Sequence, residues 1–342
     1  MVIKWLLRFS LLSCLLLFGI KYTLAQVIDL DRLEVITLSP TKIIGEGENP
    51  IPAFYKNFDV KFDESGKIYV VDSGNDRIVI LDRDGNFIKS VGRKGQGPGE
   101  FNNPMSILIN NDNIFVNDQR NGRVQIFDKD FNYRDTIFPG LHLFAGFAVD
   151  NFGNLYVNSL LGTSEEDKLI KVLSSVKPYK LKRTLLNVIK HKAGEPGNQL
   201  GMNNLCLDTD ENGNLYVAFR AKPLVIAFSK NGQEIYRYNF KGKIVDDLKE
   251  KAPGPSSSYK YMFRCVRSHG QDEVYLLSRA GIINIMRKKG IIAGRIIHLV
   301  NSLKEERTNI VTFSFDIIDK DLLVISDLVD YTVKLYKIPA WE

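Results

Sequence analysis

The stretch from residue 92 to residue 127 decides the fold, and it reads GRKGQGPGEFNNPMSILINNDNIFVNDQRNGRVQIF. A glycine-rich loop, residues 95–101, leads through an Asn-Pro pair into an apolar segment. Two more short segments rich in β-branched and aromatic residues follow, 113–116 and 124–127, and polar turn-forming residues precede each of them. Such an alternation of short apolar runs and Asn, Asp or Gly turns is typical of antiparallel β-strands.

The same order of loop, strands and turns recurs along the chain at a spacing of roughly 40 to 60 residues, the range of propeller blades. The second strand of each unit is the clearest marker, and these strands span residues 67–72, 113–118, 154–158, 214–218, 273–277 and 321–327. A tight turn of Gly, Asn and Asp residues precedes each marker strand, as expected because these residues tolerate the positive φ angles of such turns. A third strand follows each marker. Six repeats of a four-stranded antiparallel meander predict an all-β protein, a six-bladed β-propeller.

The two ends of the repeat region complement each other. The last unit lacks a fourth strand, because the chain ends at residue 342 soon after its third strand. A strand-like segment at residues 33–38 precedes the first unit and has no partner there. We therefore predict that this N-terminal strand completes the last blade, which closes the ring and removes exposed strand edges.

Residues 1–25 have the pattern of a signal peptide. Lys4 and Arg8 precede an apolar run of about twelve residues, too short to span a bilayer, and a small-residue cleavage site follows. We expect an exported protein, periplasmic, cell-surface or secreted, with a single propeller domain at residues 26–342. The alternative is a lipoprotein, because the residues before Cys14 resemble a lipobox; only then would we expect membrane attachment.

Charge and cysteine content limit the classes of partner. The formal net charge is +6, and removal of Lys4, Arg8 and Lys21 with the signal segment leaves +3. A mildly basic chain gives no reason to expect nucleic-acid binding.

Cys206 and Cys265 each stand ten residues before the tyrosine of a second strand, so they occupy equivalent positions. We expect two buried thiols, with a disulfide as the alternative.

A turn motif in the first two units carries a family resemblance. Residues 72–77 read DSGNDR and residues 118–123 read DQRNGR, and the approach GQGPGEFNNP precedes the second unit. Over residues 57–128 the chain resembles NHL repeats, and as a whole it is similar to six-bladed propellers exported by Bacteroides-type bacteria. The resemblance implies binding of proteins or other ligands, although some relatives are enzymes. Arg77 and Arg123 are each expected to pair with the aspartate of their own turn.

One face of the ring carries the long connections. Loops that follow second and fourth strands emerge together, and they include residues 45–56, 93–103, 188–203, 241–260 and 298–309. We call this the long-loop face; binding residues tend to lie on loops that a rigid scaffold holds. Lysines and aromatic residues on these loops predict binding of a protein, or of a carbohydrate or anionic small ligand, although the lysines could simply keep the loops soluble. The candidate ligand-binding residues are Tyr55, Lys94, Phe101, Lys192, Tyr259 and Arg264.

Catalytic patterns are scarce. The four histidines show no metal-binding spacing, and no nucleophile motif is present. Asp59, Asp208 and Asp316 fall on or near inner strands and are weak candidates for calcium or another divalent metal. We therefore expect a non-catalytic protein without a cofactor. The alternative is a metal-dependent, lactonase-like hydrolase or lyase with its site at the channel mouth.

Overall fold

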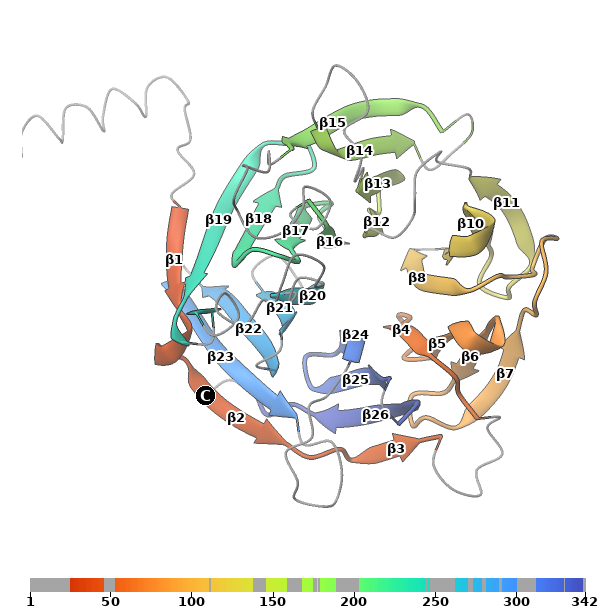
Figure 1. Cartoon of the computed structure of the whole chain (residues 1–342), viewed down its shortest axis with the longest axis horizontal. Helices are drawn as coiled ribbons and strands as arrows, with labels where there is room; N and C mark the ends of the chain where they lie inside the picture. The colour runs from red at the N-terminus through yellow and green to blue at the C-terminus, as the bar shows by residue number, and fades with distance from the viewer. Residues whose placement is uncertain are drawn as a thin grey trace, which may run out of the picture.

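Six antiparallel sheets surround a central axis in the computed structural model (Figure 1). The structure describes residues 25–45, 53–110, 112–137, 146–158, 168–174, 177, 179–188, 203–243, 245–246, 262–269, 273–278, 281–288, 291–299, 312–328 and 330–340. The predicted six-bladed β-propeller is confirmed. Short strands rich in β-branched and aromatic residues form each sheet, and most of the second and third strands are buried along nearly their whole length because neighbouring sheets cover both of their faces.

Every blade has four antiparallel strands from the axis to the rim, consecutive in the chain in blades 1 to 5, whereas the outermost strand of blade 6 comes from the N-terminal segment. They are, for blade 1, β4 (Asn57–Phe62), β5 (Ile68–Asp72), β6 (Arg77–Leu81) and β7 (Phe87–Val91); for blade 2, β8 (Pro104–Asn110), β9 (Asn113–Asp118), β10 (Arg123–Phe127) and β11 (Tyr133–Ile137); for blade 3, β12 (Phe147–Val149), β13 (Asn154–Asn158), β14 (Lys168–Ser174) and β15 (Leu181–Asn187); for blade 4, β16 (Leu205–Thr209), β17 (Leu215–Phe219), β18 (Leu224–Phe228) and β19 (Glu234–Lys241); for blade 5, β20 (Phe263–His269), β21 (Glu273–Ser278), β22 (Gly281–Lys288) and β23 (Ile291–Leu299); and for blade 6, β24 (Thr312–Ile318), β25 (Leu322–Asp327), β26 (Thr332–Lys337) and β3 (Lys42–Ile44).

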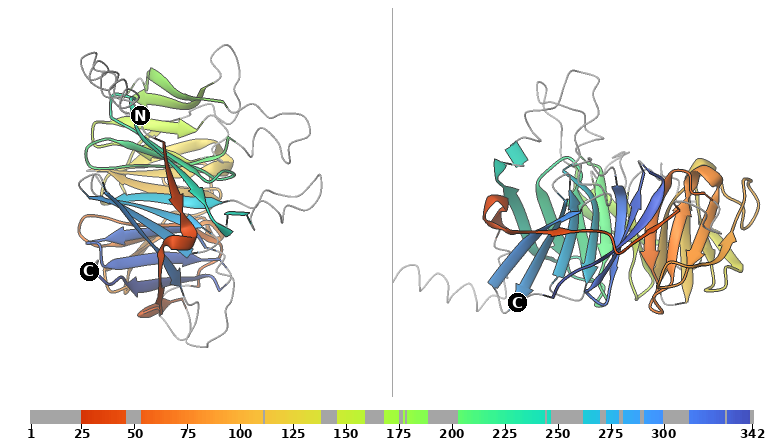
Figure 2. Two further views of the ribbon diagram at one scale, coloured as in Figure 1. Left: turned by 90° about the vertical axis from the view of Figure 1, so that its left-hand side faces the viewer. Right: turned by 90° about the horizontal axis from the view of Figure 1, so that it is seen from below.

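An N-terminal strap, residues 25–44, runs along the outside of blades 4, 5 and 6 (Figure 2). Its first strand, β1 (Ala25–Asp29), lies parallel to β19, and its second, β2 (Glu34–Leu38), lies parallel to β23. Its third strand, β3, is antiparallel to β26 and supplies the missing outer strand of blade 6. The N-terminal segment therefore closes the ring, as predicted.

The residues that close the ring differ from the predicted ones. Segment 33–38 was expected in the last blade, but it adds a fifth strand to blade 5, and residues 42–44 occupy the expected place. The physical reason lies in packing: Ile36 and Leu38 of β2 rest against the apolar cluster between blades 5 and 6. Pro40 then separates β2 from β3, because proline has no amide hydrogen to donate to a strand partner.

The tight turns between first and second strands are linked to the blade cores. In blades 1, 3 and 4 the aspartate that opens the turn accepts backbone hydrogen bonds and one from the hydroxyl of a buried tyrosine. Burial followed by the nearby carboxylate raises the pKa of each of these phenols, which keeps them protonated donors. These pairs are Tyr69 with Asp63, Tyr156 with Asp150 and Tyr216 with Asp210.

The aspartate of the repeated turn motif connects two loops of the long-loop face. In blade 2, Asp118 accepts from the backbone amide of Asn102 at 2.7 Å, from the Asn121 side chain at 2.8 Å and from Arg123 Nε at 2.8 Å. The predicted arginine–aspartate pairs are thus confirmed in both blades. The equivalent set in blade 1 is Asp72 with Tyr55, Asn75 and Arg77.

A candidate binding pocket in the central channel

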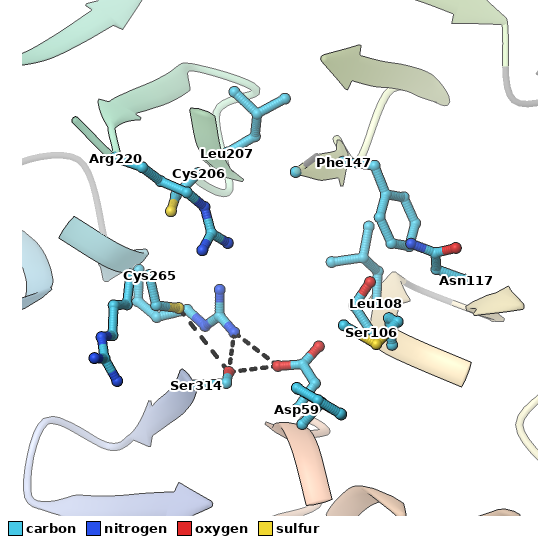
Figure 3. A pocket seen from close by; sticks show the side chains of 15 residues that line it. Asp59, Ser106, Leu108, Asn117, Phe147, Cys206, Leu207, Arg220, Cys265 and Ser314 are labelled. Atoms are coloured by element: carbon cyan, nitrogen blue, oxygen red, sulfur yellow. Dashed lines mark hydrogen bonds and ion pairs between the residues drawn. The ribbon is translucent and has the colours of Figure 1, made fainter. Parts of the chain in front are cut away.

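A cavity of ≈ 120 Å³ lies in the central channel, and residues of all six blades line it (Figure 3). The inner strands contact one another in a closed circle around the axis. Each inner strand starts at the long-loop face, and the lining residues come mainly from the first half of these strands. Asp59 of β4, Ser106 of β8, Cys206 of β16, Cys265 of β20 and Ser314 of β24 are examples. The cavity therefore lies in the half of the channel that faces the long loops.

The pocket combines apolar walls with a positively charged lining. The charged residues among the described part of the lining are three arginines, Arg220, Arg264 and Arg267, and one carboxylate, Asp59. Smaller polar groups complete the polar part of the lining, namely two thiols, two serine hydroxyls and one asparagine amide. The apolar part consists of Phe58, Met105, Leu108, Phe147 and Leu207.

Arg267 is buried and held in one geometry. Its Nε donates to the Phe315 carbonyl at 2.9 Å, and its Nη2 donates to Ser314 Oγ at 2.9 Å. The same Nη2 lies 3.3 Å from Asp59 Oδ1, and Nε lies 3.4 Å from Asp316 Oδ1. Burial by itself lowers the pKa of this guanidinium, but a neighbouring thiol and the surrounding carboxylates outweigh it and hold the pKa above its ordinary value. Arg267 is therefore a fixed positive charge.

Asp59 is saturated with hydrogen bonds. Its Oδ1 accepts from the Val60 amide at 3.0 Å, from the Ser314 hydroxyl and from Arg267, and its Oδ2 accepts from the Ile107 amide at 2.9 Å. A carboxylate offers about four lone-pair sites, so these donors use its capacity. Asp59 accordingly neutralises one arginine and has little capacity left for a ligand.

The three metal candidates share a structural role. Each accepts a hydrogen bond from a backbone amide on the inner strand of the next blade: Asp59 from Ile107 at 2.9 Å, Asp208 from Ser268 at 2.7 Å, and Asp316 from Phe62 at 2.8 Å. Cations lie beside them as well, because Lys61 Nζ is 3.7 Å from Asp208 and 3.6 Å from Asp316. Within the described ranges, no three His, Cys, Asp or Glu side chains are grouped as a metal site.

The two cysteines occupy equivalent positions, as their spacing indicates. Cys206 is paired with Ala218 and Cys265 with Leu277, in each case two residues past the tyrosine of the second strand. Both are buried free thiols in this structure. Burial raises the pKa of both thiols, that of Cys265 to about 11, against the opposing effect of nearby arginines. Both therefore stay neutral at physiological pH.

The six predicted ligand residues fall in different surroundings. Arg264 lines the pocket. Tyr55 is 45% exposed at the long-loop face, and Lys94 is exposed directly before the glycine-rich loop. Phe101 is only 1% exposed and packs against Phe127 with ring centroids 6.0 Å apart, so its ring belongs to the core rather than to a ligand surface. Lys192 and Tyr259 lie outside the described residues.

Sequence reasoning missed Arg220, Arg267 and Ser314 as pocket residues. The sequence did contain a signal for Arg267. This residue pairs with the tyrosine on the second strand of blade 5, and Lys61 pairs with the equivalent tyrosine in blade 1. Charged residues at this inner-strand position violate the apolar alternation of a buried strand. That violation marks side chains that reach the channel.

Comparisons with known proteins agree with the repeat pattern and the ring. A family model described as a 6-bladed beta-propeller matches residues 57–171. NHL repeat-containing protein 3 of Mus musculus is 36% identical over 90 residues, and its Homo sapiens counterpart is 33% identical over the same length. These matches cover 25% of this chain and 26% of each relative, so they span about a quarter of those proteins. The resemblance to NHL-repeat propellers is confirmed.

Solved structures extend the likeness to the whole ring. A Bacteroides fragilis protein described as exported superimposes with a TM-score of 0.59 at 14% identity, covering 90% of this chain and all of that one. A streptogramin B lyase superimposes with a TM-score of 0.53 at 11% identity, covering 87% of this chain and 97% of that one. At these identities the likeness shows the fold alone.

Proposed function

We propose that this chain is an exported, non-catalytic propeller that binds a protein partner through its long-loop face, centred on the mouth of the channel. The pocket at that end of the channel is the observation that carries the proposal. The resemblance to NHL repeats implies binding of proteins or other ligands, and the similarity to an NHL repeat-containing protein supports this class of activity here.

The chemistry of the pocket favours binding over catalysis. A general base needs a carboxylate or imidazole that can accept a proton from a substrate. Among the described residues of the lining, Asp59 is the one carboxylate and is already engaged by four donors, and none is a histidine. The lining thus offers donors and apolar contacts, which suit recognition.

Export and domain extent are part of the proposal. The signal-like residues 1–25 and the fold of a Bacteroides fragilis protein described as exported support a mature domain at residues 26–342. Lipid attachment at Cys14 is the alternative form of the mature chain. Within the part of the chain that the structure describes, no helix has the length and hydrophobicity of a membrane span.

Affinity capture from envelope extract tests the proposal, with immobilised residues 26–342 as bait. The double variant Tyr55→Ala with Lys94→Ala alters the long-loop face, and Lys129→Ala alters the opposite face as the matched control. We expect a specific protein to bind the wild type and the control, and to bind the double variant at least fivefold less. Equal capture by all three baits would contradict the proposal.

A metal assay on the same preparation tests the enzyme alternative. Bound calcium or zinc at about one ion per chain, together with hydrolysis or elimination activity on lactones or other esters, would replace the binding proposal with a metal-dependent lyase or hydrolase. We expect neither, because the channel carboxylates are engaged by backbone amides and by Lys61 and Arg267.

A further inference from the structure

We infer that Cys206 and Cys265 form a two-coordinate site for the soft monovalent cation Cu(I) in the wall of the central channel. The inference goes beyond the proposed function and does not depend on it. It rests on the place of the two thiols in the ring and on the ligands that the described part of the channel can and cannot supply.

Inner strands of the blades place one residue each at the same level of the channel. In blades 1, 2 and 6 this residue pairs with the one directly before the aspartate that ends the second strand. In blades 4 and 5 it is the cysteine, which pairs two residues past the tyrosine, as in blade 1. These cavity-lining residues are Asp59, Ser106, Cys206, Cys265 and Ser314. The two thiols therefore occupy neighbouring places in one layer of small side chains.

Neighbouring members of this layer lie close together. The Sγ atom of Cys265 is 4.0 Å from Ser314 Oγ, and the Ser314 hydroxyl donates to Asp59. Cys206 is the neighbour of Cys265 on the other side, and their strands, β16 and β20, contact each other. Figure 3 shows both sulfur atoms on the cavity side of these strands. A single ion in the cavity can therefore reach both thiols.

The kind and number of ligands select the ion. Thiolates suit soft ions such as Cu(I), whereas calcium and magnesium take oxygen ligands. Zinc accepts thiolates too, but it almost always takes four ligands at structural sites. Among the described members of the layer, Asp59 is engaged by four donors and Ser106 and Ser314 carry hydroxyls. The layer thus favours an ion that needs only two ligands, and Cu(I) bound linearly by two thiolates is such an ion.

Binding exchanges two protons for the metal. Both thiols are protonated in the free protein because burial raises the pKa of each, although nearby arginines, Arg267 among them, oppose this effect. Cu(I) replaces the two S–H protons, which leave to solvent, and two Cu–S bonds form without a change of oxidation state. The bis-thiolate complex carries a single negative charge, and the guanidinium of Arg267 stabilises it as it stabilises a thiolate.

Anaerobic titration of residues 26–342 with Cu(I) tests the site, with bicinchoninate as the competing chelator. We expect about one ion per chain, release of about two protons per ion and the ultraviolet absorption of a Cu–thiolate bond. X-ray absorption should show sulfur neighbours without nitrogen or oxygen. Calcium and zinc at the same concentration should not displace Cu(I).

Two variants locate the site. Cys206→Ser and, independently, Cys265→Ser should each weaken Cu(I) binding at least a hundredfold, because only one thiolate remains. Ser106→Ala is the matched control and should change binding less than twofold, since Ser106 lines the same cavity at the same level but in blade 2. The melting temperature of each variant verifies that it is folded.

The outcomes separate this inference from the proposed function. No Cu(I) uptake against bicinchoninate, uptake that survives both cysteine variants, or a shell with nitrogen or oxygen neighbours would overturn the two-thiol site. A native disulfide between Cys206 and Cys265, found by mass spectrometry of the unreduced chain, would overturn it as well. Capture of an envelope partner would then still support the proposed function, and Cu(I) uptake without any captured partner would support the metal site alone.

Discussion

Replacement of Asp59 by asparagine removes a carboxylate that joins four blades. Asp59 belongs to blade 1, and it accepts from Ile107 of blade 2, Arg267 of blade 5 and Ser314 of blade 6. Asparagine has the same shape but no charge, and its amide nitrogen cannot accept a hydrogen bond. One of the present donors would therefore face another donor, and the guanidinium of Arg267 would lose its nearest carboxylate.

The expected cost follows from these contacts. Removal of one partner from a buried ion pair costs about 3–5 kcal/mol, because the other charge stays buried. Asp316 remains 3.4 Å from Arg267 Nε, which places the loss at the lower end of that range. A buried amide that loses its acceptor adds about 1 kcal/mol. We expect a total near 4 kcal/mol, equivalent to a Tm decrease of roughly 6 °C for a chain of about 300 residues.

Urea denaturation of residues 26–342 measures this loss, followed by tyrosine fluorescence and circular dichroism, because several tyrosines are buried in the blades. The midpoint should fall while the slope m stays constant, since the surface exposed on unfolding does not change. The control is Asp112→Asn, because that side chain is 79% exposed and its loss should cost no more than about 0.5 kcal/mol. A loss below about 1 kcal/mol for Asp59→Asn would refute the view that this carboxylate holds the inner strands together.

Three further predictions concern the turn motif, the strap and the thiols. Asp118→Ala should lower the free energy of unfolding by about 3 kcal/mol, because the Arg123 side chain is only 9% exposed and would lose its carboxylate; an unchanged denaturation midpoint would contradict this. Leu30→Ala should cost about 2–4 kcal/mol because Leu30 is 2% exposed, whereas Val27→Ala, at a residue 63% exposed, should cost little in the same melting experiment. In the native state, residues 26–342 should show no rapid reaction with a disulfide reagent at pH 8, and unfolding should expose the two thiols of Cys206 and Cys265. Because the folded pKa of Cys265 is about 11, above its ordinary value, its contribution to stability is complete below pH 9 and falls as pH rises toward 11; Cys265→Ala should remove that part of the pH dependence.

Local chemistry explains which features the sequence could predict. The turns need Gly, Asn or Asp for steric reasons, and the strands need β-branched and aromatic residues, so both leave a pattern at fixed spacing. The aspartate–arginine pairs were predictable because both partners lie within six residues, 72–77 and 118–123. The equivalence of Cys206 and Cys265 follows from counting to a neighbouring tyrosine.

Features that depend on contacts between distant segments were not predictable in the same way. Whether residues 33–38 or 42–44 complete blade 6 depends on packing against strands that lie roughly 260 to 290 residues away in the sequence, and both segments have strand-like composition. The pocket forms where the inner strands of six blades converge, and no local sequence pattern predicts which of their side chains meet there. Blade 6 also replaces the arginine of the turn motif: Lys334, at 1% exposed, lies 2.7 Å from Asp327, at a different spacing in the sequence.

The strap also determines the order in which the molecule can be completed. Thr41 donates its backbone amide to the Leu335 carbonyl at 2.7 Å, although 294 residues separate the two along the chain. Loop closure over such a distance carries a large entropic cost, and contacts of this kind slow folding. The strap is synthesised first, but its strand β3 cannot pair until β26 has been synthesised, and its strand edges stay unpaired until then. A chain that is cut short before β26 can form the preceding blades but cannot complete blade 6 or close the ring. We therefore expect such a chain to be degraded by proteases and to aggregate through its unpaired strand edges.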